Sequence, residues 1–284
     1  MTFDVDSHVE IRAASEREVQ IAIRWAAEEG WNPGLADASR FYSSDPHGFF
    51  IGLIGGEPVA TVSAVRYGDD YGFLGLYIVD PRMRGRGFGW RIWQAAMAHM
   101  GDRNVGLDGV VAQQHNYEKS GFRLFYRHVR YQGVAENGSP DPCLVDLAAV
   151  DFEELAAYDR RMFGADRRAF LLRWIDQPQG AAMGIREGER LTGYGVIRAC
   201  GYGYKIGPLF ASSPPAADLL FGGLCTRVAQ QPVFLDVPDA NAAAIALAQR
   251  HGMSPVFETA RMYTQRAPET PVGEIYGVTT LELG

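Results

Sequence analysis

The hydrophobic and polar positions in the first half of the chain alternate in short blocks that predict strands interleaved with helices. Val19, Ile23 and Ala27 recur at helical spacing in residues 16–29, which indicates an amphipathic helix. Residues 73–79 are almost all apolar, as is typical of a strand at the centre of a sheet. The predicted strands are 9–12, 49–54, 59–66, 73–79, 105–112 and 122–131, and the predicted helices are 16–29, 90–100 and a short one that ends at residue 120. This order predicts an α/β fold of the α+β kind, with a twisted mixed sheet flanked by helices.

The second half repeats this order of elements after a segment with the composition of a linker. Residues 133–142 read GVAENGSPDP, with glycine, proline and polar residues and no apolar period. The strands predicted after it are 144–147, 181–186, 191–198, 204–211 and 233–237, and the helices are 152–162, 216–230 and 241–251. We therefore expect one domain over residues 1–133, a linker over 134–142 and a second domain over 143–284.

The two halves can also be aligned with each other directly. A shift of 132 positions sets residues 52–79 opposite residues 184–211 without a gap. Three glycines at predicted turns and strand edges then coincide with three others: Gly52, Gly56 and Gly75 with Gly184, Gly188 and Gly207. Because the order of elements agrees as well, the sequence indicates an internal duplication.

Composition and charge narrow the classes of function. The 284 residues include 27 Lys and Arg against 34 Asp and Glu, a net charge of −7, whereas a nucleic-acid partner needs a clustered basic face. No apolar run reaches the roughly 18 residues of a membrane span, and the N-terminus lacks the apolar segment of a signal peptide. The three cysteines and six histidines show no metal-ligand spacing. We expect a cytoplasmic protein that binds no nucleic acid, membrane or metal, and the sequence leaves a homodimer open.

Candidate chemistry is concentrated directly after the apolar strand 73–79, where residues 80–90 read DPRMRGRGFGW. Glycines let backbone N–H groups converge on an anion without obstruction by a Cβ atom. The N-terminus of the predicted helix 90–100 adds roughly half a unit of positive charge, and Arg84 and Arg86 can add charge-assisted hydrogen bonds. The segment therefore predicts a loop that binds a pyrophosphate. The alternative is a tight strand-to-helix turn without a ligand.

Two other glycine-rich phosphate loops do not fit this segment. A Walker A loop ends in Gly-Lys-Ser/Thr, which is missing here. A dinucleotide-binding loop usually follows the first strand of its domain and is followed by an acidic residue for the ribose. Here the loop comes after the fourth predicted strand, and no acidic residue is placed where it could contact a ribose.

The residues of this loop carry a resemblance to a known family. The segment Arg84–Gly89 (RGRGFG), after Val79-x-Pro81, resembles the Arg/Gln-x-x-Gly-x-Gly/Ala signature of the GNAT superfamily of N-acetyltransferases. Residues 116–122 (NYEKSGF) resemble the Tyr-Glu-Lys-x-Gly-Phe segment of the same superfamily. Residues 206–211 (IGPLFA) and 277–284 (GVTTLELG) resemble the C-terminal domain of tandem-GNAT proteins of the YitH type. The resemblance covers the whole chain and implies two tandem GNAT-like domains.

The resemblance also implies a cofactor and roles for individual residues. It implies acetyl-CoA as co-substrate and direct attack of an acceptor amine on the thioester. The residues that it implies for binding the cofactor are Tyr77, Ile78, Val79, Arg84, Gly85, Arg86, Gly87, Phe88, Gly89 and Asn116. Tyr117 occupies the position of the tyrosine that protonates the leaving thiolate, and a phenol with a pKa of about 10 suits that task. The alternative is that Tyr117 packs the last helix of its domain onto the sheet. GNAT chains commonly carry an asparagine seven residues before this tyrosine, where the present chain has Val110.

The second half lacks the features that would make a second active site. Continuing the alignment of the halves sets residues 212–219 (SSPPAADL) opposite DPRMRGRG, so no arginine or glycine remains to receive a pyrophosphate. Ala248 stands opposite Tyr117, although Asn241 lies seven residues before it. We therefore expect a degenerate domain that shapes the acceptor site.

The acceptor site is less clearly marked. Trp31 and Asn32 lie between the first helices, a region that lines the acceptor groove in GNAT folds, and Asp108 falls on a strand that can face the cleft. His115, beside Tyr117, is the histidine that we would test as a base. The leading hypothesis is an N-acetyltransferase for a small amine. The alternatives are a non-catalytic acyl-CoA sensor and a protein N-acetyltransferase whose second domain docks the substrate.

Overall fold

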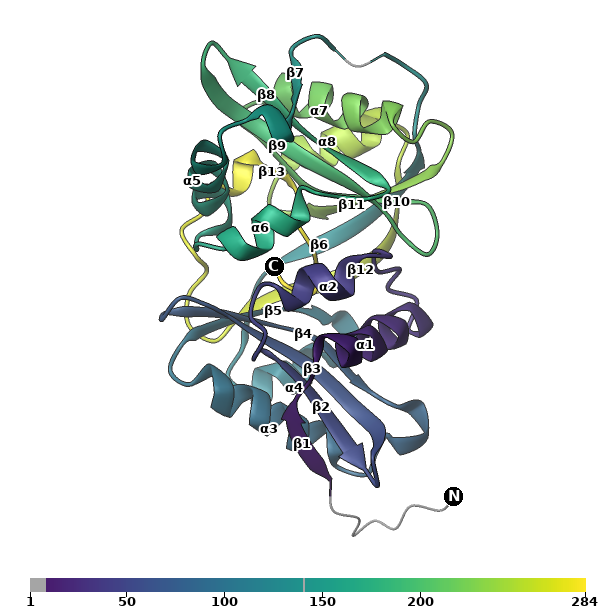
Figure 1. Ribbon diagram of the computed structural model, residues 1–284, viewed down its shortest axis with the longest axis vertical. Helices are drawn as coiled ribbons and strands as arrows, with labels where there is room; N and C mark the ends of the chain where they lie inside the picture. Colours follow the sequence, from purple (N-terminus) through teal and green to yellow (C-terminus); the bar gives the residue numbers. More distant parts are fainter. Residues whose placement is uncertain (1–8, 140) are drawn as a thin grey trace.

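The computed structural model describes residues 9–139 and 141–284 and shows two lobes stacked along the long axis of the molecule (Figure 1). The first half of the chain forms the lobe near the N-terminus, and the C-terminus lies between the lobes. The elements of the first half are β1 (Glu10–Ala13), α1 (Glu16–Glu28), α2 (Asp37–Tyr42), β2 (Phe49–Ile54), β3 (Glu57–Tyr67), β4 (Tyr71–Val79), η1 (Pro81–Met83), α3 (Phe88–Met100), β5 (Asn104–Val110), η2 (Val111–Gln113), α4 (Gln114–Lys119) and β6 (Arg123–Val134). Each strand and helix predicted for this half is confirmed, with ends shifted by a few residues, and the short helix α2 is an addition.

The second half repeats this succession, as predicted. Its elements are β7 (Leu144–Asp146), η3 (Leu147–Ala149), α5 (Phe152–Phe163), α6 (Arg168–Trp174), β8 (Gly180–Glu187), β9 (Arg190–Ala199), β10 (Tyr204–Ala211), α7 (Pro214–Thr226), β11 (Pro232–Pro238), α8 (Ala242–Arg250), β12 (Ser254–Tyr263), η4 (Val272–Glu274) and β13 (Ile275–Gly277). A shift of 132 positions sets β2, β3 and β4 almost residue for residue onto β8, β9 and β10. The sequence pattern did not predict α6, β12 or β13.

The two halves share one continuous sheet because each contributes its last long strand to the other. The strand order is β1-β2-β3-β4-β5-β12-β6-β11-β10-β9-β8-β7, and β13 pairs with β10. Strand β12 of the second half therefore pairs with β5 of the first, while β6 of the first half pairs with β11 of the second. Both strands lie at the centre of the molecule, between the lobes (Figure 1). Each lobe thus has the mixed sheet that was expected, and the exchange of β6 and β12 fuses the two sheets.

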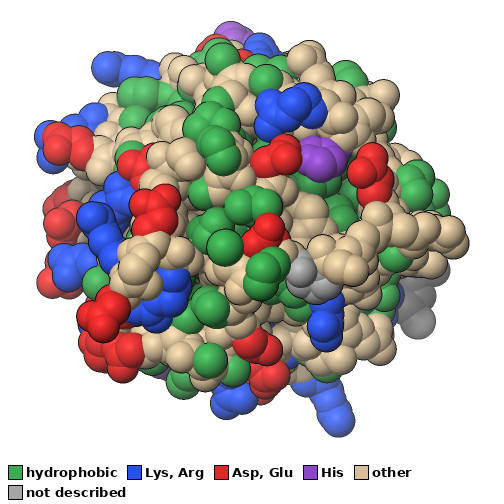
Figure 2. Space-filling view, turned by 90° about the horizontal axis from the view of Figure 1, so that it is seen from above, with side chains coloured by type: hydrophobic (Ala, Val, Ile, Leu, Met, Phe, Trp, Pro, Cys, Tyr) green, Lys and Arg blue, Asp and Glu red, His purple; other side chains and the backbone are tan. Residues whose placement is uncertain are grey.

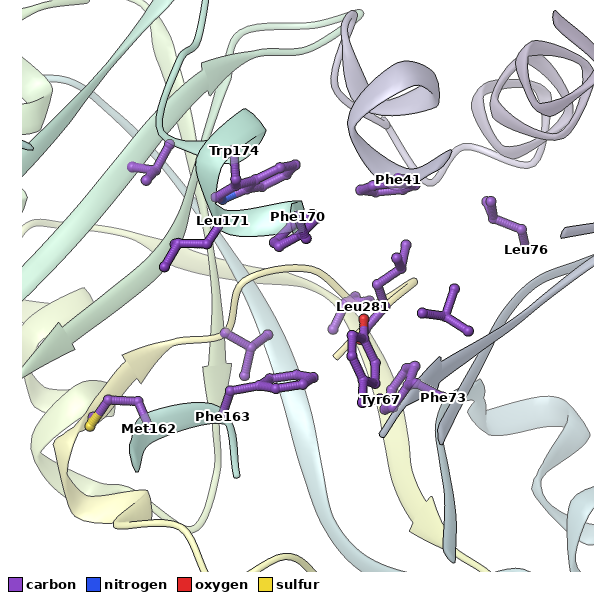
Figure 3. Close-up of a cluster of buried hydrophobic side chains, with 14 of the residues drawn as sticks. Phe41, Tyr67, Phe73, Leu76, Met162, Phe163, Phe170, Leu171, Trp174 and Leu281 are labelled. Carbon is purple, nitrogen blue, oxygen red and sulfur yellow. The ribbon is translucent and has the colours of Figure 1, made fainter. Parts of the chain in front are cut away.

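Helices cover the fused sheet, and a common core joins the lobes. Helix α3 buries Ile92, Trp93 and Ala96 against one face of the first sheet, and α7 and α8 cover part of the second. The largest apolar cluster draws residues from both halves, and its rings include Phe41 and Trp174, stacked with centroids 6.1 Å apart (Figure 3). Because burying such rings contributes several kcal/mol, the lobes are held as one unit.

The surface at one end of the molecule carries charges of both signs. Seen from the end that the second half forms, acidic and basic side chains are interspersed (Figure 2). Within the described residues, no helix is both long enough and apolar enough to cross a membrane.

Candidate active site

Strands β4 and β5 separate at their carboxyl ends and open a wedge in the sheet. The two parallel strands pair only from Tyr71 opposite Asn104 to Leu74 opposite Leu107. Immediately beyond, Leu76 adopts a positive φ of 46°, and the register between β3 and β4 shifts at the same place. A bulge of this kind bends a strand away from its neighbour. The backbone of Gly75–Val79 is therefore free of strand pairing on the side that faces β5.

A cavity of about 660 Å³ occupies this wedge. It is lined by residues from the two strands, from the glycine-rich loop and from the second half of the chain, namely Glu29, Trp31, Leu74, Gly75, Leu76, Tyr77, Ile78, Val79, Met83, Arg84, Gly85, Gly87, Gly89, Trp90, Trp93, Leu107, Asp108, Val110, Ala112, Gln113, Tyr117, Arg130, Phe257, Thr259, Leu281 and Glu282. A pocket of this size and mixed lining suits a small-molecule ligand.

The glycine-rich loop leaves the first N–H groups of α3 without a cap from its own side chains. Gly85 and Gly87 have φ values of 77° and 80°, a region that L side chains rarely adopt. Gly87 is the N-cap of α3, and no side chain caps the helix there. A Cβ atom on Gly89 would lie 2.7 Å from the Tyr77 hydroxyl, so this glycine lets the helix approach β4 closely. The arrangement presents N–H groups and a helix dipole to an anion.

Two arginines of this region are held by neighbouring groups. Arg84 donates from Nε to the carbonyl oxygen of Val79 at 3.0 Å, and its Nη2 pairs with Glu29 at the end of α1. Arg82 pairs with Asp80, Nη2 to Oδ2 at 2.6 Å. The Arg84 side chain therefore bridges the loop and α1 at the wall of the cavity.

Not every predicted cofactor residue lines the cavity. Arg86 and Phe88 belong to the loop but are not among the lining residues, and Phe88 is buried beneath the loop with Met83. Asn116 is exposed, and its amide donates to the Gln113 side chain at 2.8 Å. Gln113 itself lines the cavity. The loop glycines and the three predicted residues of β4 are brought together there.

Tyr117 lies beside the β4 edge with its ring against β5. A Cβ atom on Gly109 would come within 2.4 Å of the Tyr117 ring, and the ring of Trp93 lies 5.6 Å away, centroid to centroid. Burial, reinforced by Tyr77, raises the pKa of Tyr117 to about 12, so its hydroxyl is protonated at neutral pH. Tyr117 thus packs α4 onto the sheet and also lines the cavity, and its role as a proton donor stays a prediction. His115 is exposed beside Glu118 and is not a lining residue.

The far end of the cavity is built by both halves. Trp31 lies between α1 and α2, Arg130 on β6, and Phe257 and Thr259 on the exchanged strand β12. Trp31 accepts a hydrogen bond from Arg130 Nη1 through its backbone oxygen at 2.7 Å. This end therefore exists only because β6 and β12 cross between the lobes.

Of the three predicted acceptor residues, Trp31 and Asp108 line the cavity and Asn32 does not. The Asn32 side chain exchanges two hydrogen bonds with the backbone of Tyr202. It fastens the loop after α1 to the second half.

Buried ion pairs fix the floor beneath this end. Asp108 accepts from Arg261 Nε at 3.0 Å and from His128 Nδ1 at 2.8 Å. Burial alone would raise the pKa of Asp108, but the positive charge of Arg261 overrides it and holds the pKa below its usual value. Asp108 is therefore ionised, and the charge of Arg261 already balances its own. It is poorly suited to bind an amine as well.

The corresponding wedge in the second half is filled. Strands β10 and β11 pair only from Tyr204 to Ile206, and β13 then lies against β10 at Leu209 and Phe210. Helix α7 starts with two prolines, and the Ser213 hydroxyl accepts from the N–H of its first turn. The helix terminus is thus already capped, and the gap is occupied by the chain itself.

The asparagine that the second half retains has a structural use. Asn241 caps α8, and its amide donates to the carbonyl oxygens of Val272, Gly273 and Ile275. It holds β13 in the wedge. No group of three potential metal ligands occurs among the residues that the structure describes.

Arg130, Phe257, Thr259, Leu281 and Glu282 line the cavity but were not predicted as site residues. The exchange of strands brings Arg130 of β6 and Phe257 and Thr259 of β12 to the wedge, and the C-terminal end of the chain brings Leu281 and Glu282. A local sequence pattern carries no signal of such an exchange. The one signal that pointed to the C-terminal end of the chain was the resemblance of residues 277–284 to a tandem family.

Comparisons with known proteins agree with this geometry. Residues 17–122 match the family described as "Acetyltransferase (GNAT) family", and residues 155–277 match "Acetyltransferase (GNAT) domain". The holothin acyltransferase of Pseudoalteromonas sp. (strain SANK 73390) is 34% identical over 275 residues, 96% of this chain and 94% of its own. YitH of Bacillus subtilis (strain 168), an uncharacterised N-acetyltransferase, is 23% identical over 95% of this chain and 96% of its own.

Solved structures share the fold of the whole chain. A putative acetyltransferase from Pyrococcus horikoshii superposes with a TM-score of 0.83 at 20% identity, covering 100% of this chain and 98% of its own. A tandem GNAT protein from the clavulanic acid biosynthesis pathway gives a TM-score of 0.62 at 13% identity, covering 90% of this chain and 98% of its own. The relative at 34% identity and the two family matches together decide the assignment. The chain belongs to the GNAT family and is a tandem-GNAT acyltransferase.

Proposed function

We propose that the protein transfers an acetyl group from acetyl-CoA to a small amine by direct attack of the amine on the thioester. The observation that carries the proposal is the uncapped N-terminus of α3 beside the unpaired edge of β4. Both features open onto the same cavity. N–H groups of the loop would hold the pyrophosphate, and the backbone of residues 77–79 would hold the pantetheine arm.

In this proposal Tyr117 is the proton donor. The neutral amine attacks the thioester carbonyl carbon, a C–N bond forms, the C–S bond breaks, and the nitrogen releases one proton, which is returned to Tyr117 through water. The leaving thiolate then takes the proton of the Tyr117 hydroxyl, which lies beside β4 at the cavity wall. The same hydroxyl can stabilise the developing charge on sulfur before the proton moves.

A small acceptor is favoured over a protein. The cavity of about 660 Å³ must hold the pantetheine arm as well as the acceptor, and its far end is walled by Trp31, Phe257 and Leu281. Holothin is the first acceptor to test, because the relative at 34% identity is a holothin acyltransferase. Release of free CoA thiol with holothin, other amines and peptides would separate an enzyme for small amines from a protein acetyltransferase. A sensor would bind acetyl-CoA and turn over none of them.

The cofactor site is tested by calorimetric titration with acetyl-CoA. Gly87→Glu places a carboxylate at the helix N-terminus, and we expect the affinity to fall at least 100-fold, about 3 kcal/mol. Gly101→Glu is the matched control, because Gly101 also has a positive φ with open space around it but caps the other end of α3. Equal affinity of wild type and Gly87→Glu would end the proposal.

A further inference from the structure

The last six residues, 279–284, form a C-terminal tail that is buried between the two halves. Every residue of the tail is buried. Arg167 donates to the Thr279 hydroxyl at 2.8 Å, and the Thr280 hydroxyl accepts from the N–H of Leu283 at 2.9 Å. Leu281 lies in the common core near Tyr67 (Figure 3). The tail is thus fixed by side chains of both lobes.

The tail places Glu282 at the base of the wedge. A Cβ atom on Gly75 would lie 2.0 Å from the carbonyl oxygen of Glu282, so the tail runs directly against β4 at the residue where β4 leaves β5. Glu282 and Leu281 both line the cavity, and Glu282 is only 4% exposed. The backbone of the tail therefore lies against β4 next to the bulge at Leu76, and the residue Glu282 lines the same cavity as the backbone proposed to hold the pantetheine arm.

Glu282 has no ion-pair partner among the described residues, although three buried cations act on it. Two of these cations already have carboxylate partners: Arg130 binds Asp236, and Arg198 binds Asp37. The third, Lys205, has a buried Nζ without a hydrogen-bond partner, and Glu282 raises its pKa against the larger effect of burial. The Glu282 carboxylate therefore lies near positive charges on β6, β9 and β10 and forms no ion pair with them in the described residues.

An unpaired buried carboxylate requires an explanation. Oε2 of Glu282 is buried and has no hydrogen-bond partner within the part of the chain that the structure describes. A group left in this state destabilises the fold, because it has lost its hydrogen bonds to water without replacing them. Buried polar atoms without partners are uncommon in native proteins, and each is explained by strain, a catalytic role, or a bound water, ion or ligand. Several other buried polar atoms of the described residues also lack a partner, but Glu282 is the acidic residue among them and it lines the cavity. Asp108, the other acidic residue at this end, is already bound by Arg261 and His128.

We propose that Glu282 receives the acceptor amine and takes its proton during acyl transfer. The inference rests on the proposed function. As the nitrogen of the neutral amine bonds to the thioester carbon, one N–H proton passes to the Glu282 carboxylate. The sulfur leaves with the proton of Tyr117. Protonated Glu282 and the Tyr117 phenolate are then restored by exchange through water, and the products are the amide and free CoA.

The test compares Glu282→Gln with wild type in three measurements: acetyl-CoA affinity, thiol release with holothin, and calorimetric binding of benzylamine to the CoA complex. We expect unchanged acetyl-CoA affinity, a fall in kcat of about 100-fold or more, and at least 10-fold weaker benzylamine binding. Glu282→Asp should recover part of the rate, which a purely structural role would not predict.

Glu269→Gln is the matched control, because Glu269 also lies near the C-terminal end of the chain, but it is exposed and lies outside the tail. Rates are expressed per acetyl-CoA-binding site, so a partly unfolded variant does not obscure the result. If wild type and Glu282→Gln turn over holothin and bind benzylamine equally, the role of Glu282 is wrong while the proposed function stands. If wild type neither turns over holothin nor binds benzylamine, the assignment of Glu282 as the amine-binding residue is wrong. A wild type that does not bind acetyl-CoA would overturn the proposed function itself.

Discussion

The hydroxyl of Tyr67 donates a hydrogen bond of 2.9 Å to the carbonyl oxygen of Leu283. Tyr67 ends the long strand β3 of the first half, and Leu283 is the penultimate residue of the tail. Burial raises the pKa of Tyr67 well above its ordinary value, so the hydroxyl remains a donor at any working pH. This bond ties the tail that carries Glu282 to the sheet that carries the proposed cofactor site.

Removing this bond should therefore affect both stability and activity. In Tyr67→Phe the buried carbonyl of Leu283 loses its partner, and we expect a loss of about 1–3 kcal/mol in the free energy of unfolding. Urea unfolding measures that loss, and thiol release should fall as the tail loosens. Tyr202→Phe is the control, because that side chain is 58% exposed. Identical urea midpoints for the two variants would show that the tail is held by other contacts.

Tyr117→Phe should separate catalysis from cofactor binding. We expect kcat to fall by about 100-fold while the calorimetric affinity for acetyl-CoA stays within about twofold, since the ring packing on Gly109 is kept. Because the pKa of Tyr117 is about 12, the wild-type rate should not decline between pH 7 and pH 10 through loss of its proton. A full rate in the phenylalanine variant would leave Tyr117 with a packing role alone.

The sequence predicted the loop glycines and β4 residues that line one part of the cavity, but at its other end it named only Trp31 and Asp108, for a physical reason. Residues 80–90 are consecutive, so the strand end, the glycines and the helix N-terminus can be recognised together. The other end of the cavity combines Trp31, Arg130, Phe257 and Glu282, which lie far apart in the chain. Their meeting depends on pairing between strands, and a local pattern does not contain that pairing.

Strand β12 illustrates why the exchange could not be predicted. Its sequence, SPVFETARMY, carries Thr259 and Arg261 among buried positions, so it shows neither an apolar run nor a clean alternation. Arg261 is accommodated because Asp108 of β5 lies on the adjacent strand. The other half of the chain thus supplies the strand with which this segment pairs.

The same chemical change at two glycines should have opposite effects on stability. At Gly75 a Cβ atom would lie 2.0 Å from the backbone oxygen of Glu282, so Gly75→Ala must displace the tail, and we expect a loss of about 1–3 kcal/mol. Gly222 lies inside α7 with open space where its Cβ would be, so Gly222→Ala should add about 0.5–1 kcal/mol. Thermal unfolding of both variants measures the difference. A stable Gly75→Ala variant would mean that the tail does not press on β4.

The ion pair between Arg130 and Asp236 makes stability depend on acid pH in a defined window. The pair joins β6 to β11, Nε to Oδ1 at 2.6 Å. Burial alone would raise the pKa of Asp236, but the Arg130 guanidinium overrides it and holds the pKa at about 2. A carboxyl with a depressed pKa stabilises the fold above its unfolded value near 4, and this contribution is lost as the pH falls toward 2. The shift corresponds to about 2 kcal/mol.

Asp236→Asn tests this window directly. The substitution leaves Arg130 buried without a charged partner, so we expect a loss of about 3–5 kcal/mol at pH 7. The variant should also lack the part of the decline between pH 4 and pH 2 that Asp236 causes in wild type. Asp69→Asn, at a fully exposed carboxyl, is the control and should follow the wild-type curve. Parallel curves for Asp236→Asn and wild type between pH 4 and pH 2, measured by urea unfolding, would contradict an ionised pair at the junction of the two lobes.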